Sequence, residues 1–187
     1  HRLVGSIMTE DRGALPEDAR QQWEAERTTF QRVYDVVTGT AEYTAAAEIA
    51  ERAACSTTGA RDALSQLVEM GIAEQRGDRP TEYRRNDSYL RWKRIERLAE
   101  NHTAAALRQE LDALVEEDES LQERFDAPDP DAVSPAVFDD VDHEAVDDRW
   151  EALSRWRTVR EDLGVIQRAI HRAERNTDDR TGRSASG

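Results

Sequence analysis

The sequence has almost no lysine and few aromatic residues. Lys93 is the only lysine among 26 basic residues, and aromatic side chains make up 6% of the 187 residues. This low aromatic content favours a modest, helix-rich core over a β-sandwich or a barrel. No run of about 18 apolar residues occurs, which argues against a transmembrane helix. Cys55 is the single cysteine, so an internal disulfide cannot form.

The chain is strongly acidic. Aspartate and glutamate together number 40, and the formal net charge is -14. A surface rich in carboxylates and poor in lysine suits a protein that stays soluble in molar salt, and the composition resembles that of haloarchaeal proteins. At such salt the Debye length falls to about 3 Å, so the net charge does not exclude DNA as a partner. The lone cysteine and the absence of a secretory signal pattern predict a cytoplasmic location.

The charges are unevenly distributed along the chain. Residues 76–97 contain 8 basic and 4 acidic side chains, whereas residues 101–148 contain 2 basic and 16 acidic ones. A basic segment in an otherwise acidic chain indicates an anionic partner. The alternative is a helix start that carries solvated ion pairs.

Three helices followed by a hairpin are predicted in the N-terminal half. Thr44 and Ser56 are suitable N-caps for the second and third helices, and Gly39 and Gly71 supply stops for the first and third. The hairpin turns at Gly77, where a tight reversal is permitted. The predicted elements are helices over residues 17–38, 45–53 and 57–70 and strands over residues 72–76 and 81–85.

Helices also dominate the predicted C-terminal half. Thr103 is a suitable N-cap for the second of them, and residues from Thr177 onward are polar enough to predict a disordered tail. The residues around Met8 resemble a natural start, which would make residues 1–7 a remnant or an upstream extension. Residues 1–16 as a whole are expected to be a disordered N-terminus or such a remnant. The predicted elements are helices over residues 89–100, 104–125 and 143–176, with an acidic, proline-containing linker over residues 126–142.

Two short helices joined by a turn and followed by a hairpin form the strongest pattern in the sequence. The run from Ala46 to Arg85, AAEIAERAACSTTGARDALSQLVEMGIAEQRGDRPTEYRR, resembles the winged helix-turn-helix domain and, more narrowly, archaeal regulators of the ArsR and TrmB type. The resemblance extends from Trp23 to about Glu174 and indicates a haloarchaeal branch of that group. It implies a mainly α fold with a small β-hairpin wing, followed by helices and a long C-terminal coiled-coil helix.

The predicted elements and the resemblance together divide the chain into six segments. They are the N-terminus (1–16), the winged helix-turn-helix domain (17–85), a helical extension (86–125), the acidic linker (126–142), a C-terminal dimerisation helix (143–176) and a disordered tail (177–187).

The resemblance also implies a set of DNA contacts. The helix over residues 57–70 would be the recognition helix in the major groove, where an arginine can fork onto guanine and threonines can meet base edges. Helix N-termini and arginine forks hold phosphates in a way that survives high salt better than a diffuse basic face. The expected contacts are Ser56, Thr57, Thr58, Arg61 and Ser65 in the recognition helix, Thr44 at the start of the preceding helix, and Arg76, Arg79, Arg84 and Arg85 in the wing.

The C-terminal helix carries apolar residues that alternate three and four positions apart. Such a seam is typical of a coiled coil, and a homodimer would hold two recognition helices at a fixed separation. The alternative is that the helix folds back on residues 107–125 of its own chain. The expected dimerisation residues are Trp156, Val159, Leu163, Ile166 and Ile170.

The sequence therefore predicts a homodimeric regulator that binds double-stranded DNA at a specific sequence. No catalytic constellation, cofactor motif or metal-ligand spacing stands out, so we expect neither an enzyme nor a metal site, and no membrane partner. No small-molecule effector can be named. The alternative function is a winged-helix protein–protein interaction module without direct DNA binding.

Overall fold

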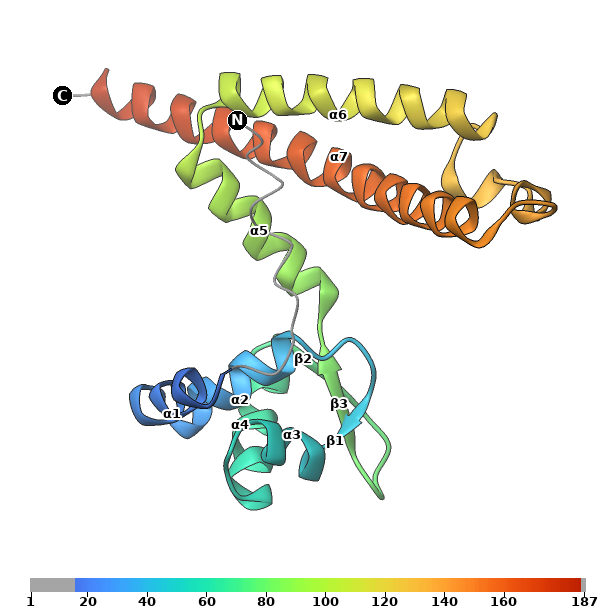
Figure 1. Ribbon diagram of the computed structural model, residues 1–187. Coiled ribbons are helices and arrows are strands. Elements are labelled where there is room, and N and C mark those ends of the chain that lie inside the picture. The colour runs from blue at the N-terminus through green and yellow to red at the C-terminus, as the bar shows by residue number, and fades with distance from the viewer. Residues whose placement is uncertain (1–15, 186–187) are drawn as a thin grey trace. The chain divides into compact units, whose positions relative to one another are not determined.

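The computed structural model describes residues 16–185, which divide into two compact units. Residues 16–93 form the N-terminal unit and residues 94–185 the C-terminal unit (Figure 1). The fold is mainly helical, at 74%, with a small antiparallel sheet and a long C-terminal helix, as predicted, and the sheet has three strands where a two-stranded hairpin was expected. The expected disordered N-terminus lies outside the described residues except for Pro16.

The elements of the N-terminal unit follow the predicted order with two additions. In chain order they are α1 (Glu17–Glu26), α2 (Thr29–Thr38), β1 (Thr44–Ala45), α3 (Ala46–Arg52), α4 (Thr57–Glu69), β2 (Ala73–Arg76), β3 (Glu82–Arg85) and the start of α5 (Asp87–Asn101).

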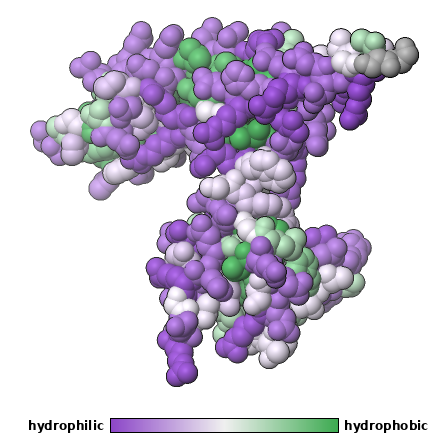
Figure 2. All heavy atoms as spheres, turned by 180° about the vertical axis from the view of Figure 1, so that it is seen from behind, coloured by the Kyte–Doolittle hydropathy of each residue, from purple (hydrophilic) through white to green (hydrophobic). Residues whose placement is uncertain are grey.

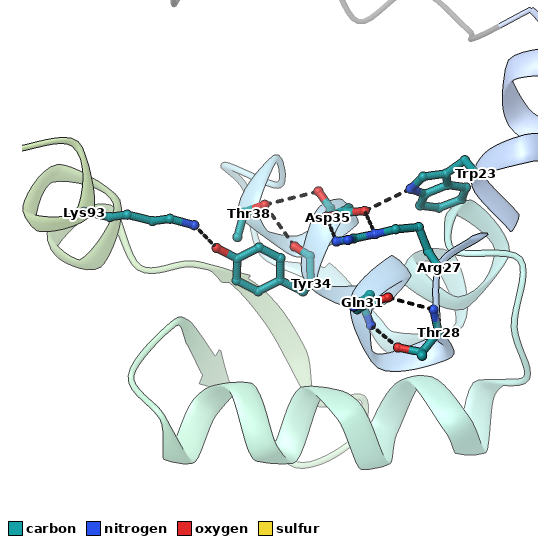
Figure 3. Close-up of polar contacts among 8 residues, drawn as sticks. All are labelled: Trp23, Arg27, Thr28, Gln31, Tyr34, Asp35, Thr38 and Lys93. Carbon is teal, nitrogen blue, oxygen red and sulfur yellow. Dashed lines mark hydrogen bonds and ion pairs between the residues drawn. The ribbon is translucent and has the colours of Figure 1, made fainter. Parts of the chain in front are cut away.

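The single helix predicted at the start of this unit is wrong, because the chain breaks at Thr28. The Thr28 hydroxyl accepts a hydrogen bond from the backbone N–H of Gln31, and the Gln31 side chain accepts one from the backbone of Thr28. This capping box begins α2 and separates it from α1. Asp35 then ties the two helices together, accepting from the Trp23 indole at 2.9 Å and from the Arg27 guanidinium at 3.0 Å (Figure 3).

The predicted cap at Thr44 is also wrong. Thr44 lies in β1 opposite Tyr83, and its hydroxyl donates to the Glu42 carbonyl oxygen at 2.9 Å. The N-cap position of α3 is Ala45, which makes no side-chain cap bond. The chain is thus held at this point by strand pairing and not by a helix cap.

The hairpin predicted after α4 is confirmed, and a third strand joins it. β3 lies in the centre of the sheet, with β1 and β2 antiparallel on either side. Gly71 ends the α4 region at a φ of +77° and Gly77 lies in the hairpin turn at +73°, in the left-handed region that glycine adopts without strain. Tyr83 of β3 is buried and joins the sheet to the helical core.

One apolar core holds α2, α3 and α4 together. Seven of its residues are 0% exposed: Val33, Val37, Ile49, Ala53, Ala60, Leu64 and Leu67. Side chains at the margin, including Tyr34 and Tyr89, pack against this core. Lys93 of α5 donates a hydrogen bond to the Tyr34 hydroxyl (Figure 3). The core thereby fixes one face of α4 and leaves the other exposed.

The C-terminal unit is built on two long antiparallel helices that lie side by side (Figure 1). Its elements are the end of α5, α6 (Ala104–Phe125), the short 3-10 helices η1 (Pro130–Ala132) and η2 (Pro135–Phe138), and α7 (His143–Ser184). Thr103 and Asp142 cap α6 and α7 through their side chains, the first as predicted. None of the described helices has the length and apolarity needed to cross a membrane.

Two predictions for this unit differ from the structure. The region over residues 126–142, expected to be a linker with little structure, contains η1 and η2, with Pro130 buried and Phe138 packed against the core. The region from Thr177, expected to be disordered, continues α7 to Ser184. Hydrogen bonds from the Thr177 and Thr181 hydroxyls to carbonyls four residues earlier accompany this last stretch.

The seam assigned to a dimer is covered by the chain itself, which corrects that assignment. Trp156, Val159 and Ile166 are 0% exposed, Ile170 is buried and Leu163 is partly buried. All of them pack in a core shared with α6, because the same spacing that suits a partner chain suits an antiparallel neighbour in the same chain. The alternative of an intramolecular helical hairpin is what the structure contains.

A buried carboxylate stabilises this hairpin. Asp118 of α6 accepts hydrogen bonds from the Trp156 indole at 2.7 Å, from Gln122 at 2.7 Å and from the Arg160 guanidinium at 2.5 Å. Burial alone raises the pKa of Asp118, but these three hydrogen bonds lower it by more, so that the pKa lies below its usual value. The ionised carboxylate is therefore the form that the fold stabilises.

Replacing Asp118 by asparagine should destabilise the C-terminal unit and change its response to pH. We expect the free energy of unfolding to fall by about 1–3 kcal/mol at pH 7, because Arg160 loses its charged partner. A carboxyl whose pKa is depressed on folding stabilises the fold above its unfolded pKa, near ~4, and this contribution is lost as pH falls through the folded pKa. Asp118→Asn should therefore lose less stability than wild type between pH 7 and pH 3.

Urea denaturation followed by tryptophan fluorescence measures both quantities. The exposed Asp112 of the same helix serves as the control through Asp112→Asn, which should behave like wild type. Equal acid sensitivity of wild type and Asp118→Asn would contradict the role of this carboxylate.

Candidate nucleic-acid interface

The exposed side of α4 carries most of the residues expected to read DNA. Ala60, Ala63, Leu64 and Leu67 are buried and set the orientation of the helix. Thr58, Arg61 and Ser65 consequently lie on the exposed side, Ser56 is exposed at the N-cap, and Thr57 is half-buried. The structure thus brings this predicted group together on one side of one helix.

Arg61 is the only basic residue on that side of α4, and it makes no ion pair within residues 16–185. Asp62 and Glu69 are exposed on the same helix, so this side is not a diffuse basic surface. A free guanidinium with five donors suits a bidentate contact to one acceptor pair. The arrangement favours a directed contact by Arg61 over general attraction to phosphate.

The N-terminus of α4 is well capped. The Ser56 hydroxyl accepts a hydrogen bond from the Gly59 backbone N–H at 3.0 Å. A Cβ at position 59 would lie 3.1 Å from that hydroxyl oxygen, so glycine keeps the first turn compact. The backbone N–H groups of Thr57 and Thr58 are the remaining donors of this turn, and such groups bind anions. Thr44, by contrast, lies on β1 and is not part of a helix N-terminus.

Three of the four wing arginines are paired with carboxylates. Arg76 pairs with Glu82 at 3.2 Å, Arg84 with Glu74 at 2.9 Å, and Arg85 with Asp87 at 2.7 Å. The hydrogen bond to Glu74 raises the pKa of Arg84 further above its usual value. Ion pairs of this basic segment, which the sequence left open as the alternative, are thus present, and strand register places acids directly opposite two of the arginines.

The fourth wing arginine is different. Arg79 lies in the exposed turn between β2 and β3 and has no ion-pair partner among the described residues of the chain. Like Arg61, it is therefore free to meet an anion without first breaking a pair.

Tyr43 belongs to the wing surface but was not predicted there. Its ring lies 4.2 Å from the Arg76 guanidinium carbon and 4.3 Å from that of Arg84, measured to the ring centroid. Both distances are well within the range of cation–π contacts. Only a weak indication of this position is present in the sequence. An aromatic residue next to Thr44 is typical of a strand, but β1 is only two residues long and too short to predict.

Cys55 lies beside this region in the turn between α3 and α4. Burial raises the pKa of its thiol, and the positive charge of Arg32 lowers it by less. The resulting rise keeps the group a neutral thiol at neutral pH, which suits its predicted role in packing. No group of three or more potential metal ligands forms within residues 16–185.

Shallow cavities occur in the C-terminal unit. One, of about 340 Å³, is lined by Arg108, Leu111, Asp112, Gln167, Ile170 and His171. Another, of about 330 Å³, is lined by Arg124, Asp148, Glu151, Ala152 and Arg155.

Comparison with known proteins gives a family without an assigned role. Residues 27–174 match the model of DUF7342, described as a family of unknown function. The match begins within the break between α1 and α2 and ends in α7, so it includes α4, the sheet and most of the α6–α7 hairpin. The chain matches no curated protein and no solved structure.

The Ser56 cap gives a test of how α4 is held. Ser56→Ala should lower the free energy of unfolding by about 1 kcal/mol, because a first-turn N–H loses its acceptor, whereas Ser56→Asp should retain the cap. Urea denaturation of the full chain measures the difference. Ser65→Ala, on the exposed side of the same helix, is the control and should change stability little. A loss of the same size in Ser56→Ala and Ser65→Ala would exclude the cap as the cause.

Proposed function

Because most of its length matches the DUF7342 model, the chain belongs to this family of unknown function, and we propose that it is a sequence-specific, double-stranded DNA-binding transcriptional regulator. In this proposal residues 17–85 are a winged helix-turn-helix domain of the ArsR and TrmB type. The observation that carries it is the packing of α4, which is fixed by a buried apolar side and presents Thr58, Arg61 and Ser65 to solvent.

Recognition is assigned to α4 as the helix that enters the major groove. Arg61 would donate its fork to a guanine, and Thr58 and Ser65 would contact neighbouring base edges. The N-terminal backbone N–H groups of α4, oriented by the Ser56 cap, would hold a phosphate and fix the register. In this arrangement Arg61 supplies most of the discrimination between sequences.

The wing is assigned to the DNA backbone. Arg79 is available for a phosphate without rearrangement, whereas Arg76, Arg84 and Arg85 must exchange a carboxylate for one. In molar salt, each phosphate contact gains little from counterion release, and charge-assisted bidentate bonds keep more of their strength. A small number of arginine contacts therefore suits a high-salt cytoplasm better than a wide basic face.

The regulator is proposed to act as a homodimer, since two half-sites one helical turn apart need two recognition helices. The buried seam of α7 serves the hairpin with α6, so a second copy would meet outer surfaces of the C-terminal unit and not Trp156 or Ile166.

A protein–protein interaction module is the second candidate function. It is favoured by the large apolar side chains exposed in the N-terminal unit, Met70 at 61% and Trp92 at 57%, although hydrophilic residues cover most of the surface in the view of Figure 2. In this case the same domain would bind another protein.

Titration of genomic fragments, including the region upstream of the protein's own gene, in near-native molar KCl decides between the two functions. The regulator should select a sequence. Arg61→Ala should lower the ratio of its affinity for the selected sequence to that for other sequences by about tenfold, equivalent to about 1.4 kcal/mol. Arg79→Ala should weaken all sequences alike and reduce the slope of log K against log salt by about 0.9, the share of one phosphate.

Arg20→Ala is the matched control, because Arg20 is exposed on α1 and paired only with Glu24. It should leave both selectivity and salt slope unchanged. If wild type shows no preference among sequences at any salt, the regulator is excluded and the interaction module becomes the working function.

A further inference from the structure

The solvent face of the sheet carries an ordered array of charges. Residues Glu74 and Arg84 are directly opposite in the β2–β3 register, as are Arg76 and Glu82. Side chains alternate along a strand, so these four lie on the face away from buried Tyr83. Each arginine is paired with the acid across from it.

Tyr43 completes the array. It directly precedes β1, whose Thr44 pairs with Tyr83, so the register carries Tyr43 toward Arg84 on the solvent face. Its ring contacts the guanidinium groups of Arg76 and Arg84 at nearly equal distances, 4.2 and 4.3 Å. One ring thus holds two cations close together, on a face whose charges sum to zero while Glu74 and Glu82 remain in place.

The two ion pairs are weak enough to exchange. The side chains of Arg76 and Glu82 are 59% and 29% exposed, and those of Arg84 and Glu74 are 40% and 41% exposed. Pairs with this exposure contribute little to stability, and molar salt screens them further. A phosphodiester offers acceptor oxygens in a geometry that guanidinium groups bind with two parallel hydrogen bonds.

We propose that Tyr43 is a positioning residue that holds Arg76 and Arg84 as a phosphate clamp, which Glu74 and Glu82 occupy until a DNA phosphate displaces them. The identification of the phosphate as that of DNA rests on the proposed function. In the free protein the acids keep this face of the sheet neutral, so the clamp closes only where α4 has already brought the backbone near. The array would thereby suppress binding to the wrong sequence.

Tyrosine substitutions test the positioning role. Binding of the duplex that wild type selects from the genomic fragments is measured across a range of KCl concentrations. Tyr43→Ala should weaken binding by about tenfold and make the salt dependence shallower, by about 0.9 for each phosphate that the variant no longer binds. Tyr43→Phe keeps the ring and should stay within about twofold of wild type. Trp92→Ala, which removes an exposed aromatic outside the array, should have no effect.

A measurement without duplex separates this proposal from the proposed function. In wild type, the Nε–Hε NMR resonances of Arg76 and Arg84 should carry a ring-current displacement and move together when inorganic pyrophosphate is added. Tyr43→Ala should abolish both effects, and Tyr43→Phe should retain them. If these shifts occur but no duplex binds, the clamp stands and DNA binding fails. If Tyr43→Ala behaves like wild type in both assays, the clamp is overturned.

The two acids give the complementary test. The double variant Glu74→Gln with Glu82→Gln frees the clamp and should bind random duplex about tenfold more tightly than wild type, with a smaller ratio of specific to random affinity. Glu24→Gln, which releases Arg20 on α1, is the matched control and should not change affinity. A double variant that binds no more tightly than wild type would overturn the role assigned to the acids.

Discussion

The pairing of β3 with two partners is the constraint on which the N-terminal unit depends. β1 precedes α3, β2 follows α4, and β3 hydrogen-bonds to both. Along the chain, α3 and α4 therefore lie between two strands that bind the same central strand. Tyr83 of β3 packs into the core that these helices share. The exposed side of α4 and the charged face of the hairpin are both consequences of this strand pairing.

Periodicity and caps predicted the parts of the fold that local sequence controls. Ser56 and Gly71 mark the ends of the α4 region as expected, and the hairpin around Gly77 forms where it was predicted. The break at Thr28 was missed because the apolar spacing continues across it, although Thr28 and Gln31 carry a capping-box signal. The short strand at Thr44 could not be predicted, because its hydrogen bonds are made to residues far along the chain.

The candidate site was predictable as a set of residues but not as a set of interactions. Burial of Leu64 and Leu67 determines that Arg61 is exposed, and this follows from helical spacing alone. The carboxylate partners of Arg76 and Arg84 depend on strand register, which the turn only partly determines. The partner of the α7 seam could not be predicted, because an apolar repeat can pack equally well against a helix of its own chain or of another.

The single lysine of the chain, Lys93, lies where chemical labelling would report on a contact between two helices. Its ammonium group is partly buried and hydrogen-bonded to Tyr34 of α2. Reagents that acylate amines usually modify a protein at many side chains, but here a single side chain can react. Apart from the α-amine of the chain, a fluorophore coupled through this chemistry would attach only at Lys93, and the reactivity of Lys93 would report how often the contact between α5 and α2 opens.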